Sequence, residues 1–227
     1  GTSVGSVAAF RKVLEILNNQ PDQKVAVVVS AMSGVTDRLI RSAQAAAEQN
    51  SDYENQLTRL LEDHVKTAQE LLDTSSVQAF VVHLQSDFKD LREILRGVWL
   101  SRHLPETTLE LVSGYGELWS SKILSQIWKK NGQPSHWLDA RKILVVEPGE
   151  TGPAVQWPIC QQNMDAKLEE LFKSHGGSNN LDAHGDSRLV ITGFVASTVK
   201  GVPTTLKRNG SDFSASIFGK LLNSREI

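Results

Sequence analysis

The feature that most constrains the fold is a continuous apolar run, Val25–Val29, that consists almost entirely of β-branched residues. Such a run predicts a strand buried on both faces, as in the interior of a parallel sheet. Small and polar residues follow at 31–37, and a predicted helix comes next. A strand, a small-residue loop and a helix N-terminus form a corner that can bind phosphate or carboxylate. The alternative, that Thr36 only caps the helix, is equally open.

Further strands are predicted at Leu189–Val195 and, less regularly, at 137–141 and 143–147. A turn rich in proline and glycine is predicted after the last of these, at 148–153. Apolar residues at helical spacing lie between the strand segments. This alternation predicts an α/β fold with a doubly wound sheet, whose ligands bind at the carboxyl ends of the strands.

Residues 51–102 predict a helical hairpin that is inserted into the α/β domain. Ser51–Glu54 is typical of a capping box, and a polar break at 73–76 separates two long helices. In the second helix, apolar residues recur at heptad spacing: Val77, Leu84, Leu91 and Val98. A seam of this kind favours helix packing, so we expect the hairpin to be scaffold or an oligomer surface.

Composition argues against several classes of function. The chain has 227 residues, 40% of them hydrophobic, and 24 Lys+Arg against 26 Asp+Glu give a net charge of −2. Without a long basic run, a nucleic-acid partner is disfavoured, and no apolar run is long enough to cross a membrane. A single cysteine, Cys160, and scattered histidines disfavour a disulfide or a protein-held metal. We therefore expect a reducing, cytoplasmic setting.

The segment Thr204–Ala215 concentrates polar and charged side chains just before an apolar helix predicted at 215–222. Its Asn-Gly pair permits the positive φ of a tight turn, and Ser211 or Asp212 can cap the helix. A turn and a cap account for neither Arg208 nor the second polar residue. We therefore predict that this segment binds a ligand.

Glycines stand beside polar groups at two other places. Gly1–Gly5 precedes a predicted helix and can bring backbone amides close to an anion. It also fits the Gly-x-Ser-x-Gly elbow of serine hydrolases, but no strand pattern comes before it in this sequence. Glu117 lies in the first turn of a predicted helix, after Gly116. A carboxylate there can stabilise the helix dipole or bind the ammonium group of a small ligand.

These segments together resemble the aspartokinases of the amino-acid kinase family. Gly1–Val4 is similar to the end of their Lys-Phe-Gly-Gly-Thr-Ser-Val opening, and Val28–Asp37 to their Val-Val-Ser-Ala-Met-Ser-Gly-Val-Thr-Asp segment. Gly116-Glu117 matches a Gly-Glu at a helix start, and Thr204–Ala215 matches Thr-Thr-Leu-Gly-Arg-Gly-Gly-Ser-Asp-Tyr-Ser-Ala. The resemblance implies a three-layer αβα sandwich with a mostly parallel central sheet.

The chain departs from the family pattern at Lys207 and Asn209, where glycine is usual. Its Arg-Asn-Gly-Ser-Asp form resembles aspartokinases fused to homoserine dehydrogenase. The family's opening lysine would precede Gly1, and its nucleotide-binding Thr-Asp-Val-Asp-Gly segment and regulatory domains would follow Ile227. We therefore expect residues 1–227 to be part of a catalytic domain, with little or no kinase activity alone.

The resemblance implies transfer of the γ-phosphoryl group of ATP to the β-carboxylate of L-aspartate. The product is 4-phospho-L-aspartate, the first step of lysine, threonine and methionine biosynthesis. Arg208 would pair with the α-carboxylate of aspartate, and Glu117 would accept its ammonium group. The other residues expected around aspartate are Thr36, Ser211, Ser30 and Ala31.

On the nucleotide side, Ser3 and the amides of Gly1 and Thr2 would face the phosphates, and Asp212 would orient the catalytic lysines. Mg²⁺ is expected on ATP rather than in a cage of protein ligands. A homo-oligomer is also expected. Two alternatives stay open: another amino-acid kinase, acting on acetylglutamate, glutamate or UMP, and a non-catalytic ligand-binding or assembly module.

Overall fold

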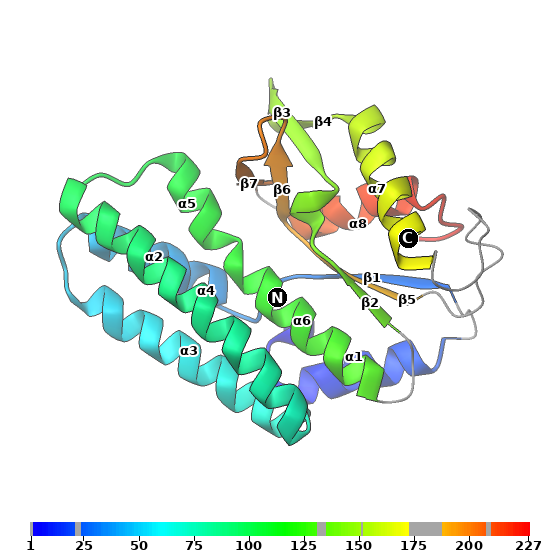
Figure 1. Cartoon of the computed structure of the whole chain (residues 1–227), viewed down its shortest axis with the longest axis horizontal. Coiled ribbons are helices and arrows are strands. Elements are labelled where there is room, and N and C mark those ends of the chain that lie inside the picture. Colours follow the sequence, from blue (N-terminus) through cyan, green and yellow to red (C-terminus); the bar gives the residue numbers. More distant parts are fainter. Residues whose placement is uncertain (1, 21–23, 131–134, 151, 173–187, 208–209) are drawn as a thin grey trace.

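A computed structural model describes residues 2–20, 24–130, 135–150, 152–172, 188–207 and 210–227 of the chain (Figure 1). The helices are η1 (Thr2–Val4), α1 (Val7–Asn18), α2 (Val35–Ala47), α3 (Asp52–Leu71), α4 (Thr74–Ser101), α5 (Glu106–Ser113), α6 (Tyr115–Lys130), η2 (Ala140–Lys142), α7 (Trp157–Phe172) and α8 (Gly210–Leu221). The strands are β1 (Val25–Val29), β2 (Ser135–Leu138), β3 (Val145–Gly149), β4 (Gly152–Val155), β5 (Arg188–Thr192), β6 (Val195–Thr198) and β7 (Pro203–Thr205).

The strands form two sheets. The first has the order β1-β5-β2, and both of its pairings are parallel. The second has the order β4-β3-β6-β7, in which β3 and β6 are parallel while β4 and β7 are antiparallel edge strands. The predicted α/β class is confirmed, and the parallel core that the resemblance implies is the β1-β5-β2 sheet.

Helices cover both faces of this first sheet. Alternate residues of β5 point to opposite faces, as in any strand. Val190 belongs to the core cluster that contains residues of α1 and α6, whereas Leu189 and Ile191 belong to the cluster of α7 and α8. Figure 1 shows α1 and α6 on one side of the sheet and α7 and α8 on the other. The three-layer αβα arrangement is therefore confirmed.

The predicted strand Leu189–Val195 is wrong at its carboxyl end, because the chain changes sheets there. β5 ends at Thr192, and β6 begins at Val195 in the second sheet. Between them, Phe194 has a φ of 65°, and its N–H donates to the Ser214 hydroxyl at 2.9 Å. The apolar pattern continues through this break, so it gives no sign of the turn.

The predicted turn at 148–153 is shorter than expected: Glu150 lies in a turn, but Pro148 and Gly149 continue β3. They pair antiparallel with Pro153 and Gly152 of β4. Proline is tolerated here because Pro153 lies on the edge strand β4, and because the pairing of β3 with β6 ends at Val146, before Pro148. The segment predicted as a strand at 137–141 leaves the sheet after Leu138 and turns into η2.

The two helices of the predicted hairpin are present as α3 and α4, which contact each other and also contact α2 and α6. Leu84, Leu91 and Val98 of the heptad seam are buried. The capping-box prediction is wrong, since the Ser51 side chain makes no capping hydrogen bond. Among the described residues, no helix, α4 included, combines the length and apolar character needed to span a membrane.

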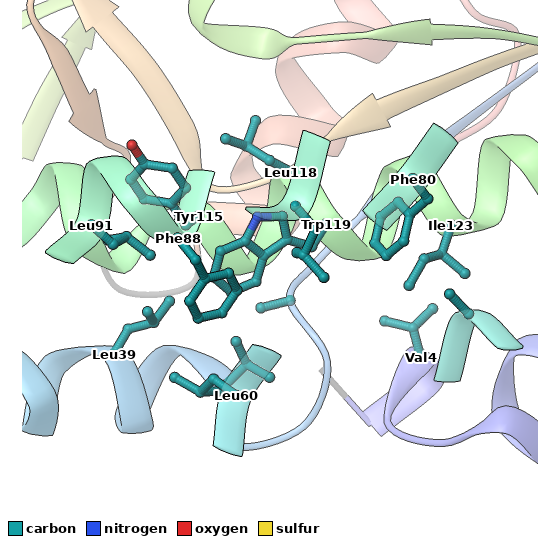
Figure 2. Packing of buried hydrophobic residues seen from close by; sticks show 14 of the residues in the cluster. Val4, Leu39, Leu60, Phe80, Phe88, Leu91, Tyr115, Leu118, Trp119 and Ile123 are labelled. Carbon is teal, nitrogen blue, oxygen red and sulfur yellow. The ribbon is translucent and has the colours of Figure 1, made fainter. Parts of the chain in front are cut away.

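The largest core cluster joins the helical hairpin to α6 (Figure 2). Trp119 of α6 is fully buried, and its ring stacks on Phe88 of α4 with 4.6 Å between centroids. The rings of Trp119 and His64 of α3 pack edge to face, with 4.8 Å between their centroids. The Trp119 Nε1 donates a hydrogen bond to the Asp87 carboxylate at 3.0 Å. The hairpin thus fixes the position of α6.

His64 should make the protein sensitive to acid. Its ring is fully buried, and its Nε2 finds no hydrogen-bond partner among the described residues. Burial lowers the pKa of His64 from 6.5 to about 4, so the unfolded chain takes up this proton first as pH falls. As the pH falls from 6.5 to about 4, the free energy of unfolding should therefore decrease, and His64 should account for about 3 kcal/mol of this decrease.

Urea unfolding at several pH values measures this effect. His64→Leu should flatten the pH dependence in that range, whereas His83→Leu, at an exposed position of α4, should leave it unchanged. An unaltered slope in His64→Leu would contradict the assignment.

Candidate functional site

The parallel strands β1, β5 and β2 end together at one edge of the first sheet. Val29, the last residue of β1, lies opposite Thr192, the last residue of β5. The N–H of Gly193 donates to the Val29 carbonyl at 2.8 Å, which holds the two chain exits together. Carboxyl ends of parallel strands are where α/β sheets bind ligands, so the loops at this edge define the candidate site.

Glu117 is the most unusual group at this edge. It lies in the first turn of α6 and retains 4% of its accessible surface. Its Oε2 finds no hydrogen-bond partner among the described residues. Burial raises the pKa of Glu117 to about 8, although the Ala31 backbone N–H opposes this shift. A buried carboxyl with an unused oxygen is suited to accept a cation such as an ammonium group.

The loop after β1 packs directly against the first turn of α6. A Cβ on Gly116 would lie 2.7 Å from the Ala31 Cβ and 2.9 Å from Val35, so only glycine allows this approach. Ser120 of α6 donates its hydroxyl to the Ser30 carbonyl at 2.7 Å. Ser30, Ala31 and Glu117 are therefore brought together.

Thr36 is half-buried in the first turn of α2. The helix begins at Val35, its N-cap is Gly34, and no side chain caps it. The alternative that Thr36 serves as the helix cap is therefore wrong. Thr36 directly follows Val35, whose side chain packs against Gly116, so Thr36 remains a candidate for the site.

Ser211 is brought to the same edge by the start of α8. The helix begins at Gly210, so Ser211 and Asp212 lie within its first turn and the predicted cap and helix start at 215 are wrong. A Cβ on Gly193 would lie 2.9 Å from the Ser211 hydroxyl and 3.1 Å from the Val29 carbonyl. Ser211 therefore lies beside the ends of β1 and β5, and Asp212 is exposed on the next position of the helix.

The other predicted site residues are less completely described. Arg208 and Gly1 lie outside the described residues, as does the side chain of Thr2. Ser3 is exposed in η1, and the adjacent Val4 is buried in the core near Ile123 (Figure 2). The roles of these residues in nucleotide and substrate binding stay predictions.

The structure adds a charged pair that the sequence reasoning missed. Asp139 is buried after β2 and accepts from Arg141 Nε at 3.0 Å and from its terminal nitrogen at 2.7 Å. The Ala140 N–H donates to the Thr192 hydroxyl at 2.7 Å, so this pair stands beside the end of β5. In the sequence, an acidic and a basic residue directly after an apolar strand could have indicated this pair. The glycine at Gly193 was a further sign, since a glycine inside a strand pattern often marks a place where another part of the chain approaches the backbone closely.

Among the described residues, no cluster of three or more histidine, cysteine, aspartate or glutamate side chains could hold a metal ion. The helices α2 and α8 begin at the candidate site, and helix N-termini favour negative charge. The edge thus combines a buried carboxyl for a cation with helix starts and loop amides for anions.

A model of one protein family matches residues 1–227, and its description is "Amino acid kinase family". The chain belongs to this family. Amino acid kinases fused to a second enzyme are among its relatives. The sequence of this chain is 36% identical to that of a bifunctional aspartokinase/homoserine dehydrogenase of Arabidopsis thaliana and 38% identical to that of one from Daucus carota. These matches take in 100% of this chain, but only 24% and 23% of the relatives.

Solved structures show the same fold at lower identity. Aspartokinase III of E. coli, in complex with aspartate and ADP, matches with a TM-score of 0.81 and 19% identity, over 99% of this chain and 46% of that chain. Aspartate kinase of Clostridium acetobutylicum matches with a TM-score of 0.68 and 16% identity, over 99% and 44%. The arrangement of helices and strands in this chain is thus that of an amino acid kinase.

Proposed function

We propose that the protein is an aspartate kinase, which transfers the γ-phosphoryl group of ATP to the β-carboxylate of L-aspartate. The product would be 4-phospho-L-aspartate, the first intermediate in lysine, threonine and methionine biosynthesis. The observation that carries the proposal is Glu117, a buried carboxyl with an unused oxygen at the carboxyl ends of β1 and β5. The names of the relatives and the aspartate and ADP in the similar solved structure support the same reaction.

In this proposal, opposite sides of the site bind the charged groups of aspartate. Glu117 accepts the ammonium group, and Arg208 forms a two-pronged pair with the α-carboxylate. Thr36 and Ser211 donate hydrogen bonds to the substrate, while Ser30 and Ala31 line the pocket. Catalysis then rests on positioning, because the β-carboxylate is already an ionised nucleophile and needs no general base.

The same edge fits the phosphates of a nucleotide. The starts of α2 and α8 favour anions, and Ser3 with the amides of Gly1 and Thr2 would face the phosphates. Mg²⁺ carried on ATP would supply positive charge to the transferring group. Asp212, exposed at the start of α8, would hold catalytic lysines in position. Homo-oligomer formation and a cytoplasmic location are further parts of the proposal.

Arg208→Lys should raise the KM for aspartate and lower kcat/KM about tenfold, with a much smaller change in the KM for ATP. Lysine keeps the charge but cannot make both parallel hydrogen bonds of a guanidinium to a carboxylate. Steady-state kinetics of the full-length protein measure this change. Wild-type constants in Arg208→Lys would remove Arg208 from the aspartate site.

The proposed substrate is tested by following ADP release from the full-length protein with aspartate, glutamate, N-acetylglutamate or UMP as the acceptor. We expect turnover with aspartate alone. Preference for another acceptor would assign the protein to a different amino acid kinase. Calorimetric binding of aspartate without ADP release would instead support a non-catalytic ligand-binding module.

A further inference from the structure

Four polar side chains join the strand before Arg208 to the helix before Glu117. Lys207 donates through Nζ to Glu106 at 2.7 Å and also to Glu110, both on α5. The Thr204 hydroxyl donates to the second oxygen of Glu110. Both oxygens of one carboxylate are therefore used by a single short segment, which makes Glu110 the centre of the cluster.

The backbone at Lys207 indicates that this side chain has a specific role. Its φ is 61°, in the left-handed region that a residue with a Cβ enters at a cost of about 1 kcal/mol. Glycine would adopt this conformation without that cost. The neighbouring Leu206 is buried, and its N–H donates to the Phe194 carbonyl at 2.7 Å, so the segment is held on both sides.

Burial identifies Glu110 as the stronger of the two partners. Its side chain is 14% exposed, against 78% for Glu106, so solvent screens its pairing with Lys207 less. The hydrogen bonds that Lys207 donates to Glu106 and Glu110 hold the pKa of Lys207 above its usual value. The ammonium group is therefore engaged by α5 and does not compete with Arg208 for a substrate carboxylate.

The residues of the cluster adjoin, in the sequence, both residues that the proposal assigns to the charged groups of aspartate. α5 ends at Ser113, and α6 begins at Tyr115 with Glu117 in its first turn. On the other side, Lys207 directly precedes Arg208 in the sequence. α5 contacts β7, the strand that carries Thr204, so a change at Glu110 would weaken the attachment of the segment Thr204–Lys207 to α5.

We propose that Glu110, Lys207 and Thr204 are positioning residues that set the distance between the Arg208 and Glu117 sides of the aspartate site. This inference rests on the proposed function. The three residues do not contact the substrate; they hold the segment that leads into Arg208 against α5. Loosening this attachment should weaken aspartate binding and leave nucleotide binding unchanged.

Steady-state kinetics of the full-length protein test the inference with Lys207→Met, Glu110→Gln and the double variant. Methionine keeps the Cβ and most of the stem of Lys207, so the backbone strain is unchanged while the charge is lost. Each single variant should raise the KM for aspartate about two- to fivefold, the range of a partly exposed ion pair. The KM for ATP and kcat should equal those of the wild type within error. Lys207→Arg, which keeps the positive charge, should keep the wild-type KM for aspartate.

The two effects should be less than additive in the double variant, because both single variants remove the Lys207–Glu110 pairing, whereas the Lys207–Glu106 pairing is lost only with Lys207→Met. Lys167→Met is the matched control. It removes a lysine–glutamate pair of similar geometry, Lys167–Glu170 at 2.8 Å, that lies on α7, and the proposal assigns this pair no role in the aspartate site. It should leave all constants unchanged.

Two results would overturn the inference: an unchanged aspartate KM in both single variants, or equal losses for aspartate and ATP. The proposed function fails in a different way, since the wild-type protein would then show no aspartate-dependent ADP release. Hydrogen exchange adds a readout without turnover, because the Leu206 amide should exchange faster in Glu110→Gln than in Lys167→Met.

Discussion

Replacement of Glu117 by glutamine should lower kcat/KM for aspartate about 10²- to 10³-fold, the largest loss expected for any single position described here. The change keeps the size of a side chain that is almost fully buried but removes its ability to carry a negative charge. A bound ammonium group would then be desolvated without an opposite charge beside it. The KM for ATP should change little, because the proposed phosphate contacts lie elsewhere.

The pH dependence gives this prediction a second signature. Burial raises the pKa of Glu117 to about 8, so the empty site holds mostly the neutral acid below that pH. An ammonium group binds to the carboxylate, and aspartate binding should therefore release a proton at pH 7. Affinity for aspartate should rise as pH increases toward 8, and Glu117→Gln should abolish this rise.

The sign for stability is opposite to that for binding. The unfolded carboxyl ionises near 4.5, whereas the folded one ionises near 8. The contribution of Glu117 to stability is therefore complete below pH 4.5 and is lost as pH rises toward 8. Calorimetry in buffers of different ionisation enthalpy measures the proton release. Glu93→Gln, on the exposed face of α4, is the control and should bind aspartate as the wild type does.

Replacement of Trp119 by alanine should lower the free energy of unfolding by about 3–5 kcal/mol. The ring is fully buried, stacks on Phe88, and is held by the hydrogen bond from Nε1 to Asp87. Its removal would leave a cavity between the hairpin and α6. Because α6 carries Glu117, activity measured below the unfolding midpoint should fall as well.

Two variants separate cavity formation from loss of the hydrogen bond. Trp119→Phe keeps most of the buried area but leaves Asp87 without the indole donor, so it should cost about 1–2 kcal/mol. Trp99→Ala removes a half-buried ring of the same hairpin and should cost less than Trp119→Ala. Chemical denaturation measures all three. A loss for Trp119→Ala no larger than that for Trp99→Ala would contradict this account of the core.

The parts of the fold that were predictable from sequence are those with strong local patterns. The run Val25–Val29 is a strand, and the heptad seam lies on a long helix, because both patterns reflect burial on defined faces. The position of Glu117 in the first turn of α6 was likewise readable from the glycine before it and the apolar helix after it.

The missed features depend on contacts between distant parts of the chain. The turn at Gly193–Phe194 interrupts an apolar run that looks continuous, since residues on both sides are buried in different sheets. The pairing of Lys207 with Glu110 spans 97 positions and follows no local rule. Similarly, Ser120 reaches the Ser30 carbonyl only because the sheet brings β1 beside α6.

The most direct test of the proposed reaction is to identify its product. The full-length protein is incubated with ATP, Mg²⁺, aspartate and hydroxylamine, which converts an acyl phosphate into a hydroxamate. We predict that aspartate β-hydroxamate forms in step with ADP, and that at low aspartate concentration Glu117→Gln slows both about 10²- to 10³-fold. ADP release that is independent of aspartate, or that yields no hydroxamate, would contradict the assignment of this site as an aspartate kinase.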